Sequence, residues 1–371
     1  MKILQIINNM ETGGAEKLLL ESLPLYNNAG IKMDILVLND HNYPFMEQLK
    51  ELNCCNIYSL GQKSVYNPLH IFQIIPFLKK YEIVHVHLFP AQYWVVIAKL
   101  LSFSKTKLVF TEHSTSNRRI QSSWMKYIDR FIYKKYHKIV CITPRVFEVV
   151  KNHANLPEAN LQIILNGVNV DKYRNAEALP KADFFPEFNG DEKFIIQVSS
   201  FHGPKDQETL IRAVSLLPEN IKLLLAGDGI ARKNSEVLVA SLKLEKRVFF
   251  LGLRMDIPNL LQNVDIIVLS SRHEGLSLSS IEGMASGKPF IASDVPGLSE
   301  IVGGFGLLFQ VGNEKELAEY ITKLLSDKEY YSSIVDNCQI RAQEFTIQSM
   351  IDKHIKLYKN ILNHNSANII K

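Results

Sequence analysis

Residues 270–289, SSRHEGLSLSSIEGMASGKP, constrain the fold of this chain more than any other stretch. They follow the unbroken apolar run Ile266–Leu269, which predicts a strand buried on both faces. A turn at Gly275 and several serines suited to N-capping come next, and apolar residues then recur at helical spacing until Gly287 and Pro289. The pattern predicts a strand, a tight turn and a helix, the repeating unit of a doubly wound α/β sheet.

Two carboxylates bracket this turn: Glu274 precedes it and Glu282 lies in the predicted helix, with seven residues between them. If the whole interval were helical it would rise about 12 Å, so the two cannot share a proton or one metal ion. The helix start between them offers backbone amides and a positive dipole end to a phosphate or diphosphate. This arrangement fits a nucleotide diphosphate sugar, and the alternative is that both are surface charges.

The length of 371 residues allows two domains, and a composition of 46% hydrophobic and 22% charged residues is typical of globular proteins. No segment approaches the roughly 18 apolar residues of a membrane-spanning helix. The first residues begin a strand without a cleavable signal pattern, so we expect a cytoplasmic protein. The four cysteines form no C-x-x-C pair, which argues against a zinc or redox site.

Positive charge is concentrated in the first half of the chain. Residues 1–170 carry 19 Lys and Arg against 12 Asp and Glu, whereas the remainder carries 23 against 26. Much of the excess lies between Lys99 and Lys151, interleaved with aromatic residues. This region could face an anionic membrane surface or an anionic lipid-linked acceptor, and a solvated helix face is the alternative. No nucleic-acid-binding motif accompanies the charge, so nucleic acid is not an expected partner.

Strands and helices alternate from the first residue, which predicts a parallel sheet covered by helices. Helical patterns cover residues 68–81 and 91–103, and Gly13 and Gly14 form a loop after the first strand that lacks the G-x-G-x-x-G spacing of dinucleotide sites. The strands predicted in this half are Lys2–Ile7, Met33–Leu38, Ile57–Leu60, Ile83–His87, Leu108–Thr111 and Lys138–Ile142.

Histidines mark the ends of two predicted strands, where ligands of parallel sheets collect. His85 and His87 are two residues apart, so they share one face of a strand. With no third ligand nearby, we expect structural or acceptor-site roles for them rather than a metal site. His113 follows the next strand, and neighbouring Glu112 is an acidic alternative.

A second α/β series follows a stretch, residues 174–192, that has little periodicity. Lys205 lies in a loop after its first strand. A departing nucleoside diphosphate develops negative charge, and the chain has no D-x-D triplet to hold a metal, so cations and amides would have to stabilise it. Gly252 would let a flat base approach the backbone, and Arg254 could meet phosphate or base.

The stretch around Glu274 and Glu282 resembles the E-x7-E signature of the retaining nucleotide-sugar glycosyltransferases of family 4. The likeness extends over nearly the whole chain and is most specific from Phe249 to Glu300. It implies the GT-B architecture, an α/β fold of two doubly wound Rossmann-like domains that face each other across a cleft. The implied parts are an acceptor-binding domain (1–170, plus the crossover helix 347–371), a linker (171–192) and a nucleotide-sugar-binding domain (193–346).

The resemblance also implies roles for individual residues. Glu274 would bind hydroxyls of the transferred sugar, Glu282 the ribose, and Lys205 with nearby amides the diphosphate. The implied catalytic residues are Glu274, His113 and Lys205. The implied donor-binding residues are Gly13, Gly14, Gly252, Arg254, Gly275, Leu276, Ser277, Leu278, Ser279 and Glu282. The implied acceptor-side residues are His85, His87, Arg118 and Arg119.

One position departs from the family pattern G-R-L-x-x-x-K: the matching run is S-S-F-H-G-P-K, with Ser200 in the arginine position. Arg254, His202 or Arg272 would have to supply the second cation.

The expected function is transfer of a sugar, with retention and without a metal or other cofactor, from a nucleotide diphosphate sugar, UDP-sugar favoured. The acceptor would be a glycan or lipid-linked molecule of cell-surface polysaccharide synthesis, with peripheral contact to the inner face of the membrane. The chain offers no dedicated carboxylate nucleophile, so we expect front-face substitution, in which the leaving phosphate accepts the acceptor's proton. Two alternatives stay open: a nucleotide-sugar 2-epimerase of the same fold, and a non-catalytic sugar-nucleotide-binding protein.

Overall fold

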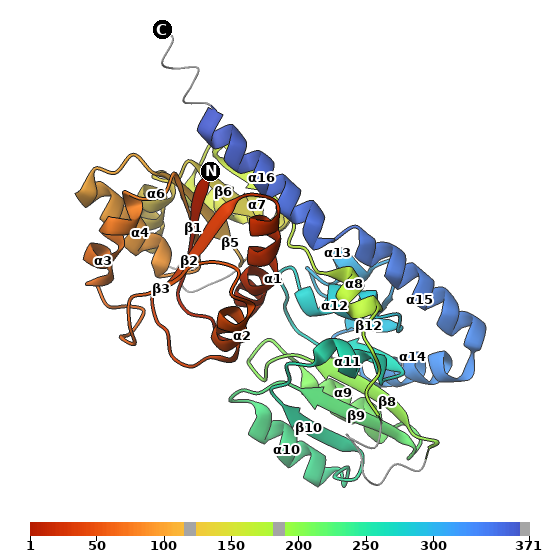
Figure 1. Ribbon diagram of the computed structural model, residues 1–371. Helices are drawn as coiled ribbons and strands as arrows, with labels where there is room; N and C mark the ends of the chain where they lie inside the picture. The colour runs from red at the N-terminus through yellow and green to blue at the C-terminus, as the bar shows by residue number, and fades with distance from the viewer. Residues whose placement is uncertain (115–123, 181–189, 364–371) are drawn as a thin grey trace. The chain divides into compact units, whose positions relative to one another are not determined.

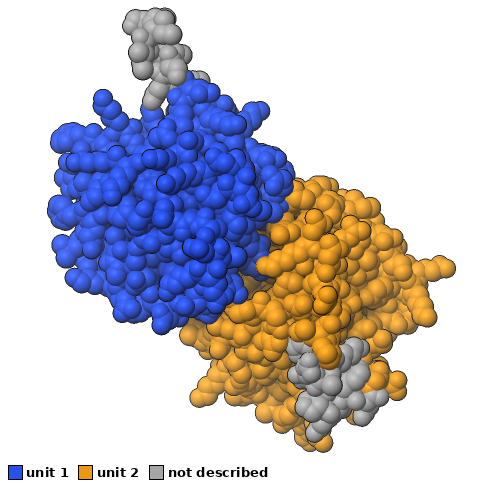
Figure 2. Space-filling model, viewed as in Figure 1, with its two compact units in different colours: residues 1–167, 347–371 blue, residues 168–346 orange. Residues whose placement is uncertain are grey.

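The computed structural model describes residues 1–114, 124–180 and 190–363 (Figure 1). The chain divides into two compact units, distinguished by colour in Figure 2. Unit 1 contains Met1–Gly167 and Ile347–Lys371, and unit 2 contains Val168–Thr346. Each unit is built on one sheet of parallel strands, which confirms the prediction of two doubly wound α/β sheets.

The sheet of unit 1 has seven strands in the order β3-β2-β1-β4-β5-β6-β7. The strands are β1 (Lys2–Ile7), β2 (Lys32–Val37), β3 (Ile57–Ser59), β4 (Ile83–His87), β5 (Lys107–Glu112), β6 (Lys138–Cys141) and β7 (Leu161–Ile163). Every residue of β4 is buried, as expected for a central strand covered on both faces. The strand order reverses between β1 and β4, so the chain connections that follow these two strands lead toward opposite sides of the sheet.

Two groups of helices accompany this sheet. One group contains α1, which contacts α2 and α16, and the other contains α4, which contacts α3 and α6. Thr143 caps α7, because its Oγ1 accepts a hydrogen bond from the amide of Val146 at 3.0 Å. The helices are α1 (Gly14–Asn28), α2 (Pro44–Leu52), α3 (His70–Leu78), α4 (Ala91–Ser102), α6 (Met125–Tyr133), α7 (Pro144–Ala154), the 3₁₀ turn η1 (Glu158–Asn160) and α16 (Ile347–Asn363).

The sheet of unit 2 has six strands in the order β10-β9-β8-β11-β12-β13, which reverses between β8 and β11. The strands are β8 (Lys193–Val198), β9 (Ile221–Ala226), β10 (Val248–Gly252), β11 (Ile266–Leu269), β12 (Phe290–Ser293) and β13 (Leu307–Phe309). All four residues of β11 are buried, as the unbroken apolar run predicts. The strand that the E-x7-E stretch follows is therefore the central strand at the point of reversal.

The helices of unit 2 include one that the sequence did not predict. It is α8, which covers the first residues of the predicted linker and packs against α11 and α12. The helices are α8 (Val170–Arg174), α9 (Gln207–Ser215), α10 (Arg232–Ser241), α11 (Ile257–Gln262), α12 (Leu278–Ala285), α13 (Ser299–Val302), α14 (Glu314–Ser326) and α15 (Lys328–Gln343). Within the three described ranges, no helix combines the length and the apolar character needed to cross a bilayer.

Candidate functional site

The two loops at the reversal point of the unit 2 sheet carry a cation and an anion that pair with each other. Lys205 follows β8 and Glu274 follows β11, and because the strands are parallel both loops leave the same edge of the sheet. The Lys205 ammonium donates a hydrogen bond to Oε1 of Glu274, and both side chains are largely buried. The structure therefore brings together two of the three residues predicted to be catalytic.

Backbone and side-chain hydrogen bonds hold these two loops together. Lys205 and Ser271 form an antiparallel bridge, and the amide of Arg272 donates to the carbonyl of Pro204 at 2.7 Å. Gln197 links β8 to the end of β11, because its side chain accepts a hydrogen bond from the amide of Ser270 at 3.0 Å and donates one to the carbonyl of the same residue at 3.2 Å. The loops that carry Lys205 and Glu274 are consequently joined to each other by hydrogen bonds.

A third loop presses against the backbone of Glu274. Gly297 has φ of +92°, and a Cβ at this position would lie 2.2 Å from the carbonyl oxygen of Gly275 and 2.6 Å from that of Glu274. Both distances are far below van der Waals contact, so only glycine fits here. The close approach fixes the turn that carries Glu274 and Gly275 against the end of β12.

The start of α12 is not capped by a side chain, contrary to the prediction from its serines. Ser277 occupies the N-cap position with extended backbone, but its hydroxyl bonds Oγ of Ser279 at 3.1 Å instead of a helix amide. Ser280 donates back to the carbonyl of Ser277 at 2.7 Å. Since no serine oxygen covers the first turn, the amides from Leu276 to Ser279 stay at the helix end that favours anions.

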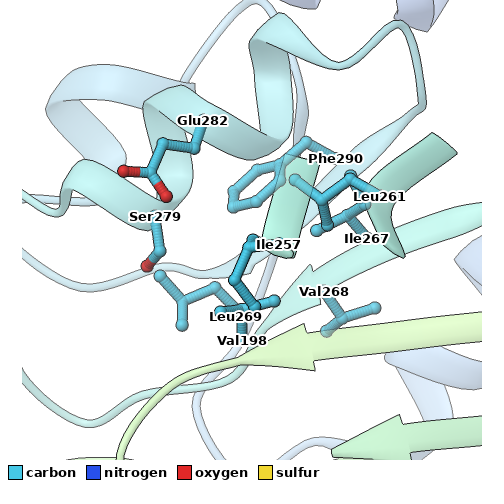
Figure 3. A pocket seen from close by; sticks show the side chains of 9 residues that line it. All are labelled: Val198, Ile257, Leu261, Ile267, Val268, Leu269, Ser279, Glu282 and Phe290. Carbon is cyan, nitrogen blue, oxygen red and sulfur yellow. The ribbon is translucent and has the colours of Figure 1, made fainter. Parts of the chain in front are cut away.

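Glu282 lies inside α12 and is 3% exposed. With Ser279 it lines a pocket of about 10 Å³, room for about one water, whose other walls are apolar. Figure 3 shows the oxygens of Glu282 and Ser279 at one end of this pocket and Phe290, Leu261 and Ile267 at the other. The buried carboxylate predicted to bind ribose is thus on a helix directly after the uncapped turn.

Three side chains are candidates for the second cation in place of the arginine missing at Ser200. Arg254 is engaged by Asp256 through two hydrogen bonds of 2.8 and 2.5 Å, which raise the pKa of the guanidinium and lower the pKa of the Asp256 carboxyl. Arg272 is well exposed and reaches Asp206 only at 3.4 Å, and His202 is exposed. Arg272 is therefore the less tightly bound of the two arginines.

A further arginine, Arg232, was not predicted from the sequence. Its guanidinium lies 5.5 Å from the ring centroid of Phe250 and donates to Glu236 at 2.8 Å. A Cβ at Gly252, which has φ of +65°, would lie 3.9 Å from the Arg232 guanidinium. An aromatic ring, an arginine and a bare backbone thus meet at the end of β10, where the sequence predicted the base to be read.

In unit 1, the three predicted histidines belong to one cluster, in which His85 and His87 are buried and His113 is half-buried. His85 and His87 share a face of β4 as predicted, with their rings stacked at 4.6 Å between centroids. His87 Nδ1 bonds His113 Nε2 at 3.0 Å, which brings the third histidine to the end of the same face. His85 is bonded at both ring nitrogens, to Tyr358 and to Thr111, each at 2.6 Å. Both nitrogens of His85 are therefore used inside the fold.

Helix α16 completes this histidine cluster. His354 accepts or donates a 2.8 Å hydrogen bond with the hydroxyl of Tyr26, and its ring stacks on that of Tyr358. Burial is the main cause that lowers the pKa of all four histidines, to about 4 for His113 and about 3 for His354, and neighbouring histidines add to the effect in His85, His87 and His354. The cluster is consequently neutral at pH 7.

We expect the free energy of unfolding to fall steeply as the pH drops below about 6.5. A histidine whose pKa is lowered by folding takes up its proton more readily when unfolded, so acid favours the unfolded chain. Each such group contributes about 1.4 kcal/mol per pH unit, or about 2 kcal/mol between pH 6.5 and pH 5. Between pH 6.5 and pH 5 the free energy of unfolding of a His354→Phe variant, measured with denaturant, should fall by about 2 kcal/mol less than that of the wild type.

Tyr26→Phe is the matched control, because it removes the hydrogen bond of His354 but keeps the titrating ring. It should lower stability at every pH and leave the slope unchanged. Equal slopes for wild type and His354→Phe would contradict the assignment of His354 as a neutral buried group.

The glycine loop of unit 1 encloses a carboxyl group. A Cβ at Gly13 would lie 2.2 Å from Oε2 of Glu16, so the space that a side chain would fill is taken by this carboxyl, whereas Gly14 is exposed as the first residue of α1. Burial is the main cause that raises the pKa of Glu16 to about 7. The loop therefore holds a carboxyl group whose pKa is raised into the neutral range.

Arg118 and Arg119 lie outside the described residues. Among the described residues, no group of three or more His, Cys, Asp or Glu side chains is arranged to hold a metal ion.

Two residues of the candidate site were not predicted from the sequence: Arg232 and Gln5, whose side chain bonds His87. The signal for Gln5 was available, because it is the one polar residue inside the apolar strand KILQII after its first lysine.

Comparison with known families covers both units. Residues 12–172 match the family described as Glycosyltransferase Family 4, and residues 180–341 match Glycosyl transferases group 1. The chain is 25% identical over 360 residues to N-acetylgalactosamine-N,N'-diacetylbacillosaminyl-diphospho-undecaprenol 4-alpha-N-acetylgalactosaminyltransferase of Campylobacter jejuni, covering 91% of this chain and 94% of that protein. It is 24% identical to the O-antigen biosynthesis glycosyltransferase WclY of Escherichia coli, covering 97% and 99% of the two chains.

Solved structures show the same fold. Anabaena Alr3699/HepE in complex with UDP-glucose superposes with a TM-score of 0.83 at 21% identity, covering 97% of this chain and 100% of that one. The lipopolysaccharide outer core galactosyltransferase WaaB superposes with a TM-score of 0.70 at 17% identity over 97% and 99% of the chains. With its two doubly wound sheets, its E-x7-E stretch and family matches over both units, this chain belongs to family 4 of the retaining glycosyltransferases and has the GT-B fold.

Proposed function

We propose that this glycosyltransferase uses a UDP-sugar and adds the sugar to a glycan or lipid-linked acceptor of cell-surface polysaccharide synthesis. The observation that carries the donor site is the ion pair of Lys205 and Glu274 beside the uncapped start of α12. The choice of UDP and of a surface-glycan acceptor is supported by the similar proteins, HepE with UDP-glucose and the Campylobacter and Escherichia coli enzymes.

In this proposal the residues of unit 2 bind the donor from end to end. Glu274 accepts hydrogen bonds from hydroxyls of the transferred sugar, and Glu282 accepts from the ribose. The Lys205 ammonium shifts part of its contact from Glu274 to the diphosphate. The diphosphate also accepts hydrogen bonds from the backbone amides of Leu276 to Ser279. Gly252, with Phe250 and Arg232 beside it, receives the base.

The same groups stabilise the departing diphosphate. As the bond to the anomeric carbon breaks, negative charge grows on the leaving phosphate, and a preorganised ammonium and helix amides lower the energy of that charge. The leaving phosphate accepts the proton of the acceptor hydroxyl on the same face of the sugar, so configuration is retained. The second cation is assigned to Arg272, because Arg254 is held by Asp256 in two hydrogen bonds, whereas the guanidinium of Arg272 reaches Asp206 at 3.4 Å and is well exposed.

Unit 1 is proposed to bind the acceptor and to supply His113. In this proposal the neutral ring of His113 binds a hydroxyl of the transferred sugar, and Gly13 and Gly14 contribute to donor binding. His85 and His87 act behind His113 and not as direct acceptor ligands, because their nitrogens are already bonded inside unit 1.

Thermal unfolding with a panel of UDP-, GDP- and ADP-sugars tests the donor. We expect a UDP-sugar to raise the unfolding temperature, since a ligand at about 100 times its Kd stabilises by about 2.7 kcal/mol. The shift should disappear in Glu282→Ala and persist in Glu319→Ala, an exposed glutamate of α14. A shift for none of the nucleotide sugars, or one insensitive to Glu282, would refute this donor site.

Product analysis then separates the three possible activities of the fold. Transfer to an added acceptor with retention supports the proposal. Conversion of the UDP-sugar to its 2-epimer, or binding without turnover, would replace it with one of the two alternatives.

We also propose that unit 1 rests on an anionic membrane surface at the cytoplasmic side, where a lipid-linked acceptor would be found. On α6 and the residue before it, Trp124, Tyr127 and Phe131 are each more than half exposed, at helical spacing. Lysines accompany them, and the ammonium of Lys135 lies 4.8 Å from the ring centroid of Phe131. Exposed aromatic rings with basic neighbours are typical of interfacial helices.

Sedimentation with lipid vesicles tests this surface. We expect binding to phosphatidylserine vesicles that weakens between low and moderate salt, because the Debye length shortens, and weaker binding to phosphatidylcholine. Phe131→Ser should reduce binding several-fold. Ile340→Ser, which removes a comparably exposed apolar side chain from α15, should not. Absence of sedimentation at every salt concentration would exclude the membrane proposal.

A further inference from the structure

A line of hydrogen bonds crosses three neighbouring strands of unit 1 and ends at His113. Gln5 lies in β1, His87 ends β4 and His113 follows β5, and these strands are adjacent in the sheet. Oε1 of Gln5 bonds Nε2 of His87 at 2.9 Å, and Nδ1 of His87 bonds Nε2 of His113 at 3.0 Å. Gln5 and His87 are almost completely buried.

The direction of each bond follows from the chemistry of its partners. The amide nitrogen of Gln5 donates to the sulfur of Met33 at 3.2 Å, which turns its oxygen toward His87. An amide oxygen only accepts, so Nε2 of His87 carries the proton. A neutral imidazole has one N–H, and Nδ1 of His87 must therefore accept from Nε2–H of His113.

This order leaves Nδ1 of His113 without a proton. Burial keeps both rings neutral by lowering their pKa values, to about 4 for His113, which is consistent with one proton on each ring. Nδ1 of His113 has no hydrogen-bond partner among the described residues. A nitrogen with a lone pair accepts a hydrogen bond, so its partner must be a donor such as a hydroxyl group.

We propose that Gln5 and His87 are positioning residues that hold His113 in the Nε2–H tautomer and so present Nδ1 as the acceptor for a hydroxyl of the transferred sugar. The sugar contact rests on the proposed function, whereas the tautomer does not. His113 is by this assignment a hydrogen-bond acceptor and neither an acid nor a cation during transfer.

Histidine ring resonances test the tautomer directly. Two-dimensional ¹H–¹⁵N correlation of protein with ¹⁵N-labelled histidine at pH 7.5 distinguishes the two ring nitrogens, and His113→Gln and His87→Gln assign the signals. We expect the Nε2–H form for both histidines in the wild type. A wild-type His113 protonated at Nδ1 would overturn the proposal that Gln5 and His87 set its tautomer, whether or not any variant folds.

Gln5→Met then tests the dependence on Gln5, since methionine keeps the length of the side chain but offers His87 no amide oxygen. We expect His113 to populate both tautomers and kcat to fall about tenfold, with little change in the KM for the UDP-sugar because unit 2 binds the nucleotide. Thr111→Val is the matched control: it removes a buried partner of His85 in the same cluster but leaves the bonds of His87 intact.

The outcomes separate the control of the His113 tautomer from the proposed function. An unchanged His113 tautomer in Gln5→Met would overturn the proposal that Gln5 and His87 set the tautomer of His113. A changed tautomer with unchanged kcat would overturn the contact of His113 with the sugar but would support the control of its tautomer by Gln5 and His87. If the wild type bound no nucleotide sugar, the proposed donor would fall, and the resonances of His87 and His113 would still decide the tautomer.

Discussion

A Lys205→Met variant should lose about 10²–10³-fold in kcat and remain folded. Removing one preorganised donor from a developing negative charge has an effect of this order. Methionine preserves the length and apolar stem of lysine and deletes only the ammonium that bonds Glu274. Glu274 then loses its charged partner, so we also expect a decrease of about 1–3 kcal/mol in the free energy of unfolding. Steady-state kinetics with the donor identified by thermal unfolding, together with denaturant unfolding, measures both quantities.

The chain offers a matched ion pair at the opposite edge of the same two strands. Lys193 begins β8, Asp265 precedes β11, and their charged atoms lie 3.1 Å apart. Lys193→Met therefore removes a lysine from a carboxylate on the same strand pair but away from the carboxyl ends, and kcat should stay within about twofold. Equal losses in the two variants, or no loss in Lys205→Met, would contradict the catalytic role of Lys205.

The fold was predictable because its strands are apolar and short and its helices are amphipathic. β1 and β4 have the bounds that were predicted. Apolar runs bounded by polar residues identify such strands without knowledge of their neighbours. Alternation of strands with helices then determines parallel pairing, so the sheet type follows from local patterns alone.

The pairing of Lys205 with Glu274 could not be read from the sequence in the same way. The two residues are 69 positions apart and meet because β8 and β11 are neighbours at the reversal of the strand order. Each residue type was predictable from its motif, but their mutual contact depends on strand order. The same holds for Arg254: the sequence places it near the site, and only the fold shows that Asp256 engages it.

The histidine cluster shows a second limit of sequence reasoning. His85 lies two residues before the end of β4, close to an edge of the sheet where ligands collect, yet Tyr358 bonds it from a helix 273 positions later. Spacing along the chain predicts that His85 and His87 share a face, but it carries no information about what covers that face. The sequence shows Gln5 as a polar residue in an apolar strand, but it does not show that the partner of Gln5 is His87 on the neighbouring strand.

We expect Gly297→Ala to lower the free energy of unfolding by about 2–4 kcal/mol and kcat/KM by about 10²-fold. A left-handed φ of +92° strains any residue with a Cβ, and here the Cβ would also meet two carbonyl oxygens, of Gly275 and Glu274, at 2.2 and 2.6 Å. These are backbone atoms, so no side-chain rotation relieves the contact and the turn itself must shift. A displacement of about 1 Å at a reacting group can reduce the rate about 10²-fold.

Gly312→Ala separates strain from contact. Gly312 has a similar positive φ of +77° and lies in the same unit, but a Cβ there would meet nothing within 4 Å among the described residues. Alanine at this position therefore costs only about 1–2 kcal/mol of backbone strain, and kcat/KM should equal that of the wild type. If Gly312→Ala reduced kcat/KM as much as Gly297→Ala, general destabilisation would explain both. A loss confined to Gly297→Ala would show that the packing of the β12 loop on the Glu274 turn is what holds the Glu274 carboxylate in place.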